Sequence, residues 1–205
     1  MQYVENLITR YPQLQDCVPA IEEIVSAIVS AHKNGGKVLL CGNGGSAADC
    51  EHISGELLKG FLSKRKIGET EYPELANPFL RENLQKGVSA IPLSSLSALY
   101  TAFCNDVSPE LTFAQLVFAL GRKEDVFLGI STSGNAKNVA AAAETANALG
   151  MKAFGLTGAK ESKLSALCLY TVQVPETETY KVQELHLPVY HAICAEVERR
   201  VFEKN

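Results

Sequence analysis

Two short segments of this chain combine glycine with hydroxyl and amide side chains. Gly42-Asn43-Gly44-Gly45-Ser46 follows the apolar run Val38–Cys41, and Ser131-Thr132-Ser133-Gly134-Asn135 follows the apolar run at residues 125–130. Glycine turns expose backbone N–H groups, and a helix that begins behind such a turn adds the positive end of its dipole. Both segments therefore predict an anion site, and their side chains suit a phosphate ester.

These hydroxyl groups could instead cap helices and fill turns, which is an ordinary role of serine and threonine. The presence of two such segments favours the phosphate site over that alternative. Neither a G-x-x-x-x-G-K-[ST] nor a G-x-G-x-x-G string occurs in the chain. A nucleoside triphosphate or a dinucleotide is therefore not indicated.

A second set of polar residues carries acid, base and metal-binding chemistry. His52 and Glu56 are four residues apart and would share a helix face, one turn after Asp49. Gln183 and His191 are eight residues apart and would line one stripe of a later helix. The four side chains His52, Glu56, Gln183 and His191 could hold a divalent metal ion. They could equally supply an acid and a base without metal, or be ordinary residues of amphipathic faces.

The pattern of apolar residues predicts the elements that position these groups. Strands are expected at residues 38–41, 88–93, 125–130, 151–156 and 169–174, and helices at residues 94–105, 111–120, 136–149 and 180–202, with another that starts at an N-cap Ser46. Strands that alternate with helices predict one Rossmann-like α/β domain whose five-stranded parallel sheet is covered on both faces. Both glycine segments would lie at the carboxyl edge of that sheet, where such folds bind ligands.

Two regions fall outside this alternation. Residues 1–36 predict two helices joined around residues 12–19, and since helices ahead of the first strand have no obvious place in the layers, we expect them to pack against a neighbouring subunit. Residues 63–87 contain Pro73 and Pro78 and no sustained periodicity, which predicts an insertion with one short helix around residues 79–84. Its basic triplet Lys64-Arg65-Lys66 favours a solvated surface over an anion site.

Composition restricts the class of protein. The chain has 205 residues, a net charge of −4 and no basic block, so nucleic acid is not an expected partner. Its six cysteines are scattered without a C-x-x-C pair, which favours buried reduced thiols in a cytoplasmic protein. No signal peptide and no apolar stretch long enough to span a bilayer is visible.

Taken together, the motifs resemble those of the phosphoheptose isomerase family, which belongs to the sugar isomerase (SIS) domain group. The resemblance is carried by residues 42–49, by His52 and Glu56, by residues 131–135, and by Gln183-Glu184-Leu185-His186 with His191. It runs from the N-terminal helices to the last helix, and only residues 63–87 have no recognised counterpart. The resemblance implies a homotetramer of SIS domains with N-terminal helices that serve oligomerisation.

The resemblance also implies an activity and the residues that carry it. Family members convert sedoheptulose 7-phosphate to D-glycero-D-manno-heptose 7-phosphate through an enediol. Glu56 would be the general base that moves a proton between C1 and C2, and His191 the acid that serves the oxygens or opens the ring. His52, Glu56, Gln183 and His191 would bind zinc in members that contain the metal. The implied substrate-binding residues are Asn43, Gly44, Gly45, Ser46, Ser131, Thr132, Ser133, Asn135 and Gln183.

Two departures from the family pattern bear on the identity of the sugar. Ala136 stands where the family often has a further serine, and Ser94-Ser95-Leu96-Ser97 stands where an acidic residue is usual. An isomerase of a different sugar phosphate is therefore one alternative. Another is a non-catalytic SIS tetramer that binds a replication initiator protein as an adaptor. A sugar-phosphate-sensing regulator is a third, and the lack of a DNA-binding module disfavours it.

The spacing of the first motif gives one further expectation. Ser46 and Glu56 are ten residues apart, which is about 15 Å along an ideal helix axis. An extended seven-carbon phosphate is shorter than this. We therefore expect Glu56 or His191 to reach the carbon end of the substrate from a neighbouring subunit.

Overall fold

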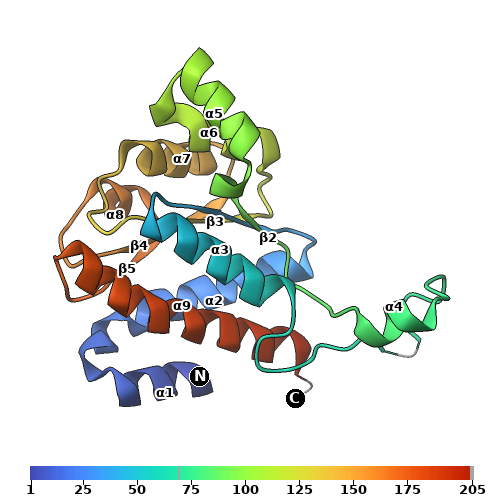
Figure 1. Cartoon of the computed structure of the whole chain (residues 1–205). Coiled ribbons are helices and arrows are strands. Elements are labelled where there is room, and N and C mark those ends of the chain that lie inside the picture. The colour runs from blue at the N-terminus through green and yellow to red at the C-terminus, as the bar shows by residue number, and fades with distance from the viewer. Residues whose placement is uncertain (69, 204–205) are drawn as a thin grey trace.

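A parallel sheet of five strands lies at the centre of the computed structural model, which describes residues 1–68 and 70–203 (Figure 1). Residues 69, 204 and 205, which the expected domain and insertion include, lie outside the described part. The strand order is β2-β1-β3-β4-β5, and every neighbouring pair is parallel. The strands are β1 (Val38–Cys41), β2 (Ala90–Pro92), β3 (Val126–Ile130), β4 (Lys152–Thr157) and β5 (Tyr170–Gln173). The predicted α/β class and five parallel strands are confirmed, with strand ends within two residues of those expected.

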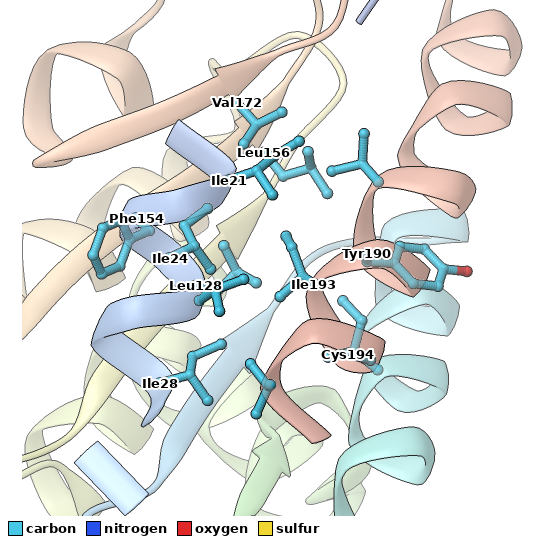
Figure 2. Close-up of a cluster of buried hydrophobic side chains, with 14 of the residues drawn as sticks. Ile21, Ile24, Ile28, Leu128, Phe154, Leu156, Val172, Tyr190, Ile193 and Cys194 are labelled. Carbon is cyan, nitrogen blue, oxygen red and sulfur yellow. The ribbon is translucent and has the colours of Figure 1, made fainter. Parts of the chain in front are cut away.

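Helices cover both faces of the sheet because the central strands β1, β3 and β4 present apolar residues to both sides. The first face is covered by α2 (Val18–Lys33), α3 (Gly45–Leu58) and α9 (Thr179–Phe202), and the second by α6 (Thr112–Leu120), α7 (Lys137–Ala148) and the short α8 (Lys163–Leu167). Figure 2 shows Ile21, Ile24 and Ile28 of α2 packed between the sheet and Ile193 of α9. Burying each of these isoleucines fully contributes about 1.5–3 kcal/mol to the free energy of unfolding.

The N-terminal helices are placed differently from the expectation. α2 lies directly on the sheet, and its apolar residues between Ile21 and Ala31 are at most 8% exposed and belong to the core. α1 (Gln2–Arg10) comes first in the chain and is joined to α2 through the 3-10 turn η1 (Pro12–Cys17). It packs on α9 with Val4 and Leu7 buried. The argument that helices ahead of the first strand have no place in the layers is therefore wrong for α2, because its apolar stripe covers the sheet.

The segment at residues 63–87 leaves the body of the molecule, as predicted, and its helix α4 (Pro78–Asn83) lies far from the sheet (Figure 1). The prediction that its basic triplet is solvated is wrong for Arg65. That side chain is buried, and its Nε donates to Oε1 of Glu198 on α9 at 2.6 Å. A buried charge such as that of Arg65 needs a partner of opposite charge, and the Glu198 carboxylate therefore holds the start of the segment against α9.

The remaining helices agree with the sequence except in detail. α5 (Ser97–Asp106) begins three residues later than expected, with Leu96 as its N-cap and no side-chain cap, and two 3-10 turns, η2 (Leu93–Ser95) and η3 (Pro109–Leu111), flank it. α8 was not expected, although Ser162 and Ser165 form a capping box at its start. All six cysteines are free thiols, and four are buried.

Within residues 1–68 and 70–203, no helix is both long enough and apolar enough to cross a membrane.

Candidate active site

The chain changes direction across the sheet between β1 and β3. From β1 it crosses through α3 to β2 on one side, and from β3 it crosses through α7 to β4 on the other. Loops that leave neighbouring strands in opposite directions open a crevice at their carboxyl ends, which is the usual ligand site of this class of sheet. Both glycine segments stand there, as the sequence predicted.

The first segment forms a sharp turn into α3. Gly44 has a φ of +56°, a conformation that side-chain-bearing residues rarely adopt, and it is the N-cap of the helix. The prediction that Ser46 is the N-cap is wrong, since Ser46 lies inside the first turn and only 3% of it is exposed. A Cβ atom on Gly45 would collide with the side-chain amide of Gln183 on α9. Glycine therefore lets Gln183 lie against the N-terminus of α3.

The two glycine segments are joined by a pair of amides. Asn43 Nδ2 donates to Oδ1 of Asn138, and Asn138 Nδ2 donates back to Oδ1 of Asn43, both at 2.9 Å. Asn138 lies in the first turn of α7, and the sequence reasoning did not identify it. Its position, three residues after the end of the second glycine segment, is the sequence feature that would have indicated a place in the site.

The second segment is held together by its own side chains. Asn135 donates through Nδ2 to the carbonyl oxygen of Ser133 at 3.0 Å, and its Oδ1 accepts from the backbone N–H of Lys163 at 3.1 Å. Ser131 is 7% exposed and Thr132 is half-buried, whereas Ser133 is exposed. Asn135 thus stabilises the loop and holds it against α8, while Ser131, Thr132 and Ser133 supply the hydroxyl groups of the loop.

His52, Glu56 and His191 meet where α3 packs on α9. The Nε2 atoms of His52 and His191 are 3.3 Å apart, and His52 Nε2 is 3.4 Å from Oε1 of Glu56. The Glu56 side chain is 16% exposed, and its Oε2 lies 3.4 Å from Nζ of Lys59. Burial and the neighbouring His52 lower the pKa of His191, which favours its neutral form. The structure therefore brings together the expected base, the expected acid and a second imidazole.

A buried tyrosine and a half-buried aspartate lie behind His52. The Tyr190 hydroxyl lies 3.0 Å from Nδ1 of His52 and donates to Oδ1 of Asp49 at 3.2 Å. Burial, and next Asp49, raise the pKa of Tyr190. Burial also raises the pKa of Asp49, against the opposing hydrogen bond from Tyr190. Tyr190 was absent from the predicted site because its position in the apolar stripe of α9 is typical of a core residue.

Two other residues of α9 lie apart from this cluster. Gln183 lies at Gly45, which is about 10 Å along α3 from His52 by the rise of 1.5 Å per residue. His186 is completely buried, with Nε2 3.3 Å from the carbonyl oxygen of Thr157, and burial lowers its pKa to about 4. In the part of the chain that the structure describes, no three His, Cys, Asp or Glu side chains form a ready metal site. The four expected zinc ligands are therefore not gathered as a set.

The two departures from the family pattern also lie at this edge of the sheet. Ala136 is the N-cap of α7 and has no side chain with which to cap it. Ser95 donates from Oγ to Oε1 of Glu51 on α3 at 2.9 Å. A carboxylate thus stands beside the turn after β2, but α3 supplies it.

A cavity of about 490 Å³ adjoins His191. Its lining comes from α1, α9 and residues 61 and 62, including Tyr3, Arg10, Phe61 and His191. His191, the expected acid, therefore borders a hollow under the N-terminal helix α1.

Comparison with known proteins decides the family. Two models described as SIS domain match residues 2–77 and 96–195. A phosphoheptose isomerase of Aneurinibacillus thermoaerophilus is 36% identical over 93% of this chain and 86% of its own length, and phosphoheptose isomerase 2 of Campylobacter jejuni is 36% identical over 99% and 92%. The chain belongs to the phosphoheptose isomerase family. A phosphoheptose isomerase of Francisella tularensis has the same fold, with a TM-score of 0.78, 31% identity and coverage of 97% of this chain and 95% of the other.

Family membership covers nearly the whole chain, including the candidate site. The first SIS match continues to residue 77, so it includes part of the region that was expected to be an insertion. The bounds of that insertion stay a prediction. A more distant structure, that of the Vibrio vulnificus NanR protein at 16% identity and a TM-score of 0.55, shares the fold alone.

Proposed function

We propose that this member of the phosphoheptose isomerase family converts sedoheptulose 7-phosphate to D-glycero-D-manno-heptose 7-phosphate. The observation that carries the proposal is the cluster in which His52 Nε2 lies 3.3 Å from Nε2 of His191 and 3.4 Å from Oε1 of Glu56. His52 and Glu56 lie on α3, the helix that begins at the glycine turn. A carboxylate beside two imidazoles suits the movement of a proton next to a carbonyl group.

The phosphate end of the substrate would be held at the crevice between β1 and β3. Ser46, in the first turn of α3, and Ser131, in the loop after β3, lie there, and α3 directs the positive end of its dipole to the same place. Thr132 and Ser133 extend this set of hydroxyls. Asn43 and Asn135 support the site indirectly, since their amides connect and shape the loops.

The reaction requires the proton on C1 to reach C2. In the proposed mechanism Glu56 removes the C1 proton, and the electron pair forms the C1–C2 double bond of an enediol as O2 gains a proton. Glu56 then returns its proton to C2 while O1 loses one, which leaves the aldehyde at C1. His191, whose Nε2 lies 3.3 Å from Nε2 of His52, serves the oxygen atoms as acid and base. A positioned base of this kind typically accelerates a reaction by about 10²–10⁴-fold.

A zinc ion is part of the proposal as a family expectation. Imidazole nitrogens and a carboxylate oxygen are suitable ligands in type, so His52, Glu56 and His191 would hold the ion if their side chains rotated toward one point. Gln183 would have to be drawn from its place at Gly45. The ion would polarise the carbonyl oxygen and stabilise the enediolate. Zinc titration of the chelator-treated protein, followed by calorimetry, tests binding independently of turnover.

We also propose that the protein works as a homotetramer. The cavity beside His191 lies open under α1, and a neighbouring subunit placed against it would complete the carbon end of the substrate site. Light scattering that gives four times the mass of one chain would agree with this assembly. A monomer with full activity would contradict it.

The identity of the substrate is tested by a panel of ketose phosphates, each incubated with the protein with and without a chelator. We expect sedoheptulose 7-phosphate to give an aldose phosphate of the same mass that separates by chromatography. Turnover of another ketose phosphate alone would favour the alternative substrate. No product from any of them, with a protein partner that co-purifies, would favour the adaptor.

A further inference from the structure

The hydroxyl of Tyr190 has a position that core packing alone does not require. Tyr190 is only 2% exposed, and its ring lies at the margin of the buried cluster between α9 and the sheet. Figure 2 shows the oxygen directed away from the apolar side chains. On that side it meets α3, where Asp49 and His52 lie one turn apart.

The hydrogen-bonding capacity of these groups determines where the protons lie. A phenol has a single hydrogen to donate. Asp49 Oδ2 is buried and has no partner among the described residues, so the bond from Tyr190 to Oδ1 is what satisfies this carboxyl group. If Tyr190 donated to His52 instead, Asp49 would lose that bond, at a cost of about 1–3 kcal/mol or more for a charged group. Tyr190 therefore donates to Asp49 and accepts from His52.

The second half of this arrangement concerns His52. If the Tyr190 oxygen accepts from Nδ1, then Nδ1 carries the hydrogen and Nε2 carries the lone pair of the neutral ring. That lone pair faces His191 Nε2 at 3.3 Å and Glu56 Oε1 at 3.4 Å. The lone pair is thus presented to the proposed base and acid, where it can accept a proton or bind a cation.

We propose that Tyr190, oriented by Asp49, is a positioning residue that holds His52 in the Nδ1–H form. The link to catalysis rests on the proposed function, because that function makes the His52–Glu56–His191 cluster the reacting site. The effect on the tautomer does not rest on it. Without the Tyr190 hydroxyl, His52 would gain by carrying its hydrogen on Nε2, from which it could donate to Glu56 Oε1.

The test is the tautomer of His52, measured by ¹⁵N NMR on the full chain without metal or substrate. The His52 signals are assigned by their loss in His52→Gln. We expect the Nδ1–H form in the wild type and a shift to the Nε2–H form in Tyr190→Phe, which keeps the ring and removes only the oxygen. Tyr180→Phe, at an exposed tyrosine of the same helix, is the matched control and should leave the tautomer unchanged.

A second readout is zinc affinity, which we expect to fall by about 10–100-fold in Tyr190→Phe because partners behind a histidine ligand orient it. An Nε2–H form of His52 in the wild type would overturn the proposal, even if Tyr190→Phe failed to fold. An unchanged tautomer in a folded Tyr190→Phe would overturn it as well. Absence of turnover with sedoheptulose 7-phosphate would count against the proposed function and leave the tautomer result standing.

Discussion

At the residue scale, small polar contacts connect parts of the site that are distant in sequence. The amide pair of Asn43 and Asn138 joins the loop after β1 to the first turn of α7, and Gln183 lies against Gly45. Each contact fixes a loop whose own backbone is exposed. The proposed phosphate site thus depends on residues that would not themselves touch the phosphate.

The amide pair gives a prediction about substrate affinity. Asn138→Ala removes both hydrogen bonds, so the first loop is less firmly held and the free energy of phosphate binding weakens. From about 0.5–1.5 kcal/mol for a hydrogen bond, we expect KM to rise by roughly 2- to 10-fold with kcat little changed. Steady-state kinetics with the sugar phosphate measure this. Glu144→Ala, at an exposed position of the same helix, is the control. An equal KM in the two variants would disprove the role of the amide pair.

At the element scale, α9 is the helix that organises the rest. One face presents Tyr190 and His191 to α3, and its last turns hold two further segments through buried carboxylates. Glu196 Oε2 accepts from the backbone N–H of Tyr3 at 3.3 Å, which fastens α1. Glu198 accepts from Arg65 and from the backbone N–H groups of residues 61–63, which fastens the start of the segment at 63–87. The same helix therefore carries His191, the proposed acid, and holds the segments that form the walls of the cavity beside it.

The Glu198 anchor gives a prediction about stability. Glu198→Gln leaves Arg65 buried without a counter-charge, so we expect the free energy of unfolding to fall by about 3–5 kcal/mol. Denaturation by urea measures the loss, and Glu144→Gln is the control. In the double variant Arg65→Met with Glu198→Gln, part of the loss should return because no unpaired charge remains. An unchanged urea midpoint for Glu198→Gln would refute the anchor.

The same carboxylate predicts a dependence of stability on pH. Burial by itself raises the pKa of Glu198, but the N–H groups of Phe61 and Leu62 and the guanidinium of Arg65 outweigh it, and the net pKa is lowered. Its stabilisation is therefore complete above the unfolded pKa of about 4.3 and is lost as the pH falls through the lower folded value. Urea midpoints measured below pH 5 should decline less steeply in Glu198→Gln than in the wild type. Parallel declines would contradict this.

The elements differ in how far the sequence predicts them. β1 and β3 are apolar runs followed by glycine-containing segments, so both the strands and the turns behind them were predictable. Tyr190 was not, because its role depends on the hydroxyl meeting α3, and no periodicity reveals which helix packs on which. Arg65 was misjudged for the same reason, since its partner lies 133 residues away on α9. Local patterns thus identified the elements, and long-range contacts decided what individual side chains do.

At the scale of the whole molecule, the site has two ends. The glycine turn, Ser131 and Gln183 lie at the sheet edge, whereas Glu56 lies further along α3 and His191 lies further along α9, where it lines the cavity under α1. The cluster of His52, Glu56 and His191 forms within one chain. A substrate shorter than the distance between the two ends would then take its phosphate site from one subunit and its base from another.

This division predicts complementation between inactive variants. Ser46→Ala with Ser131→Ala removes the phosphate hydroxyls, and Glu56→Gln removes the base. If each site combines two subunits, unfolding and refolding the two variants together should produce turnover that neither variant shows alone. In the control, Glu56→Gln is refolded with a variant that carries Glu56→Gln in addition to Ser46→Ala and Ser131→Ala, so that no subunit has the base. A mixture as inactive as its parents would indicate that each site is complete within one chain.

The most direct test of the central claim compares wild type and Glu56→Gln in the turnover of sedoheptulose 7-phosphate, with product separation as the readout. Glutamine keeps the shape of the side chain but cannot accept the C1 proton. We predict that the wild type forms the aldose phosphate and that Glu56→Gln is at least about 10²-fold slower, with an unchanged urea midpoint. Turnover by Glu56→Gln close to that of the wild type would contradict the account.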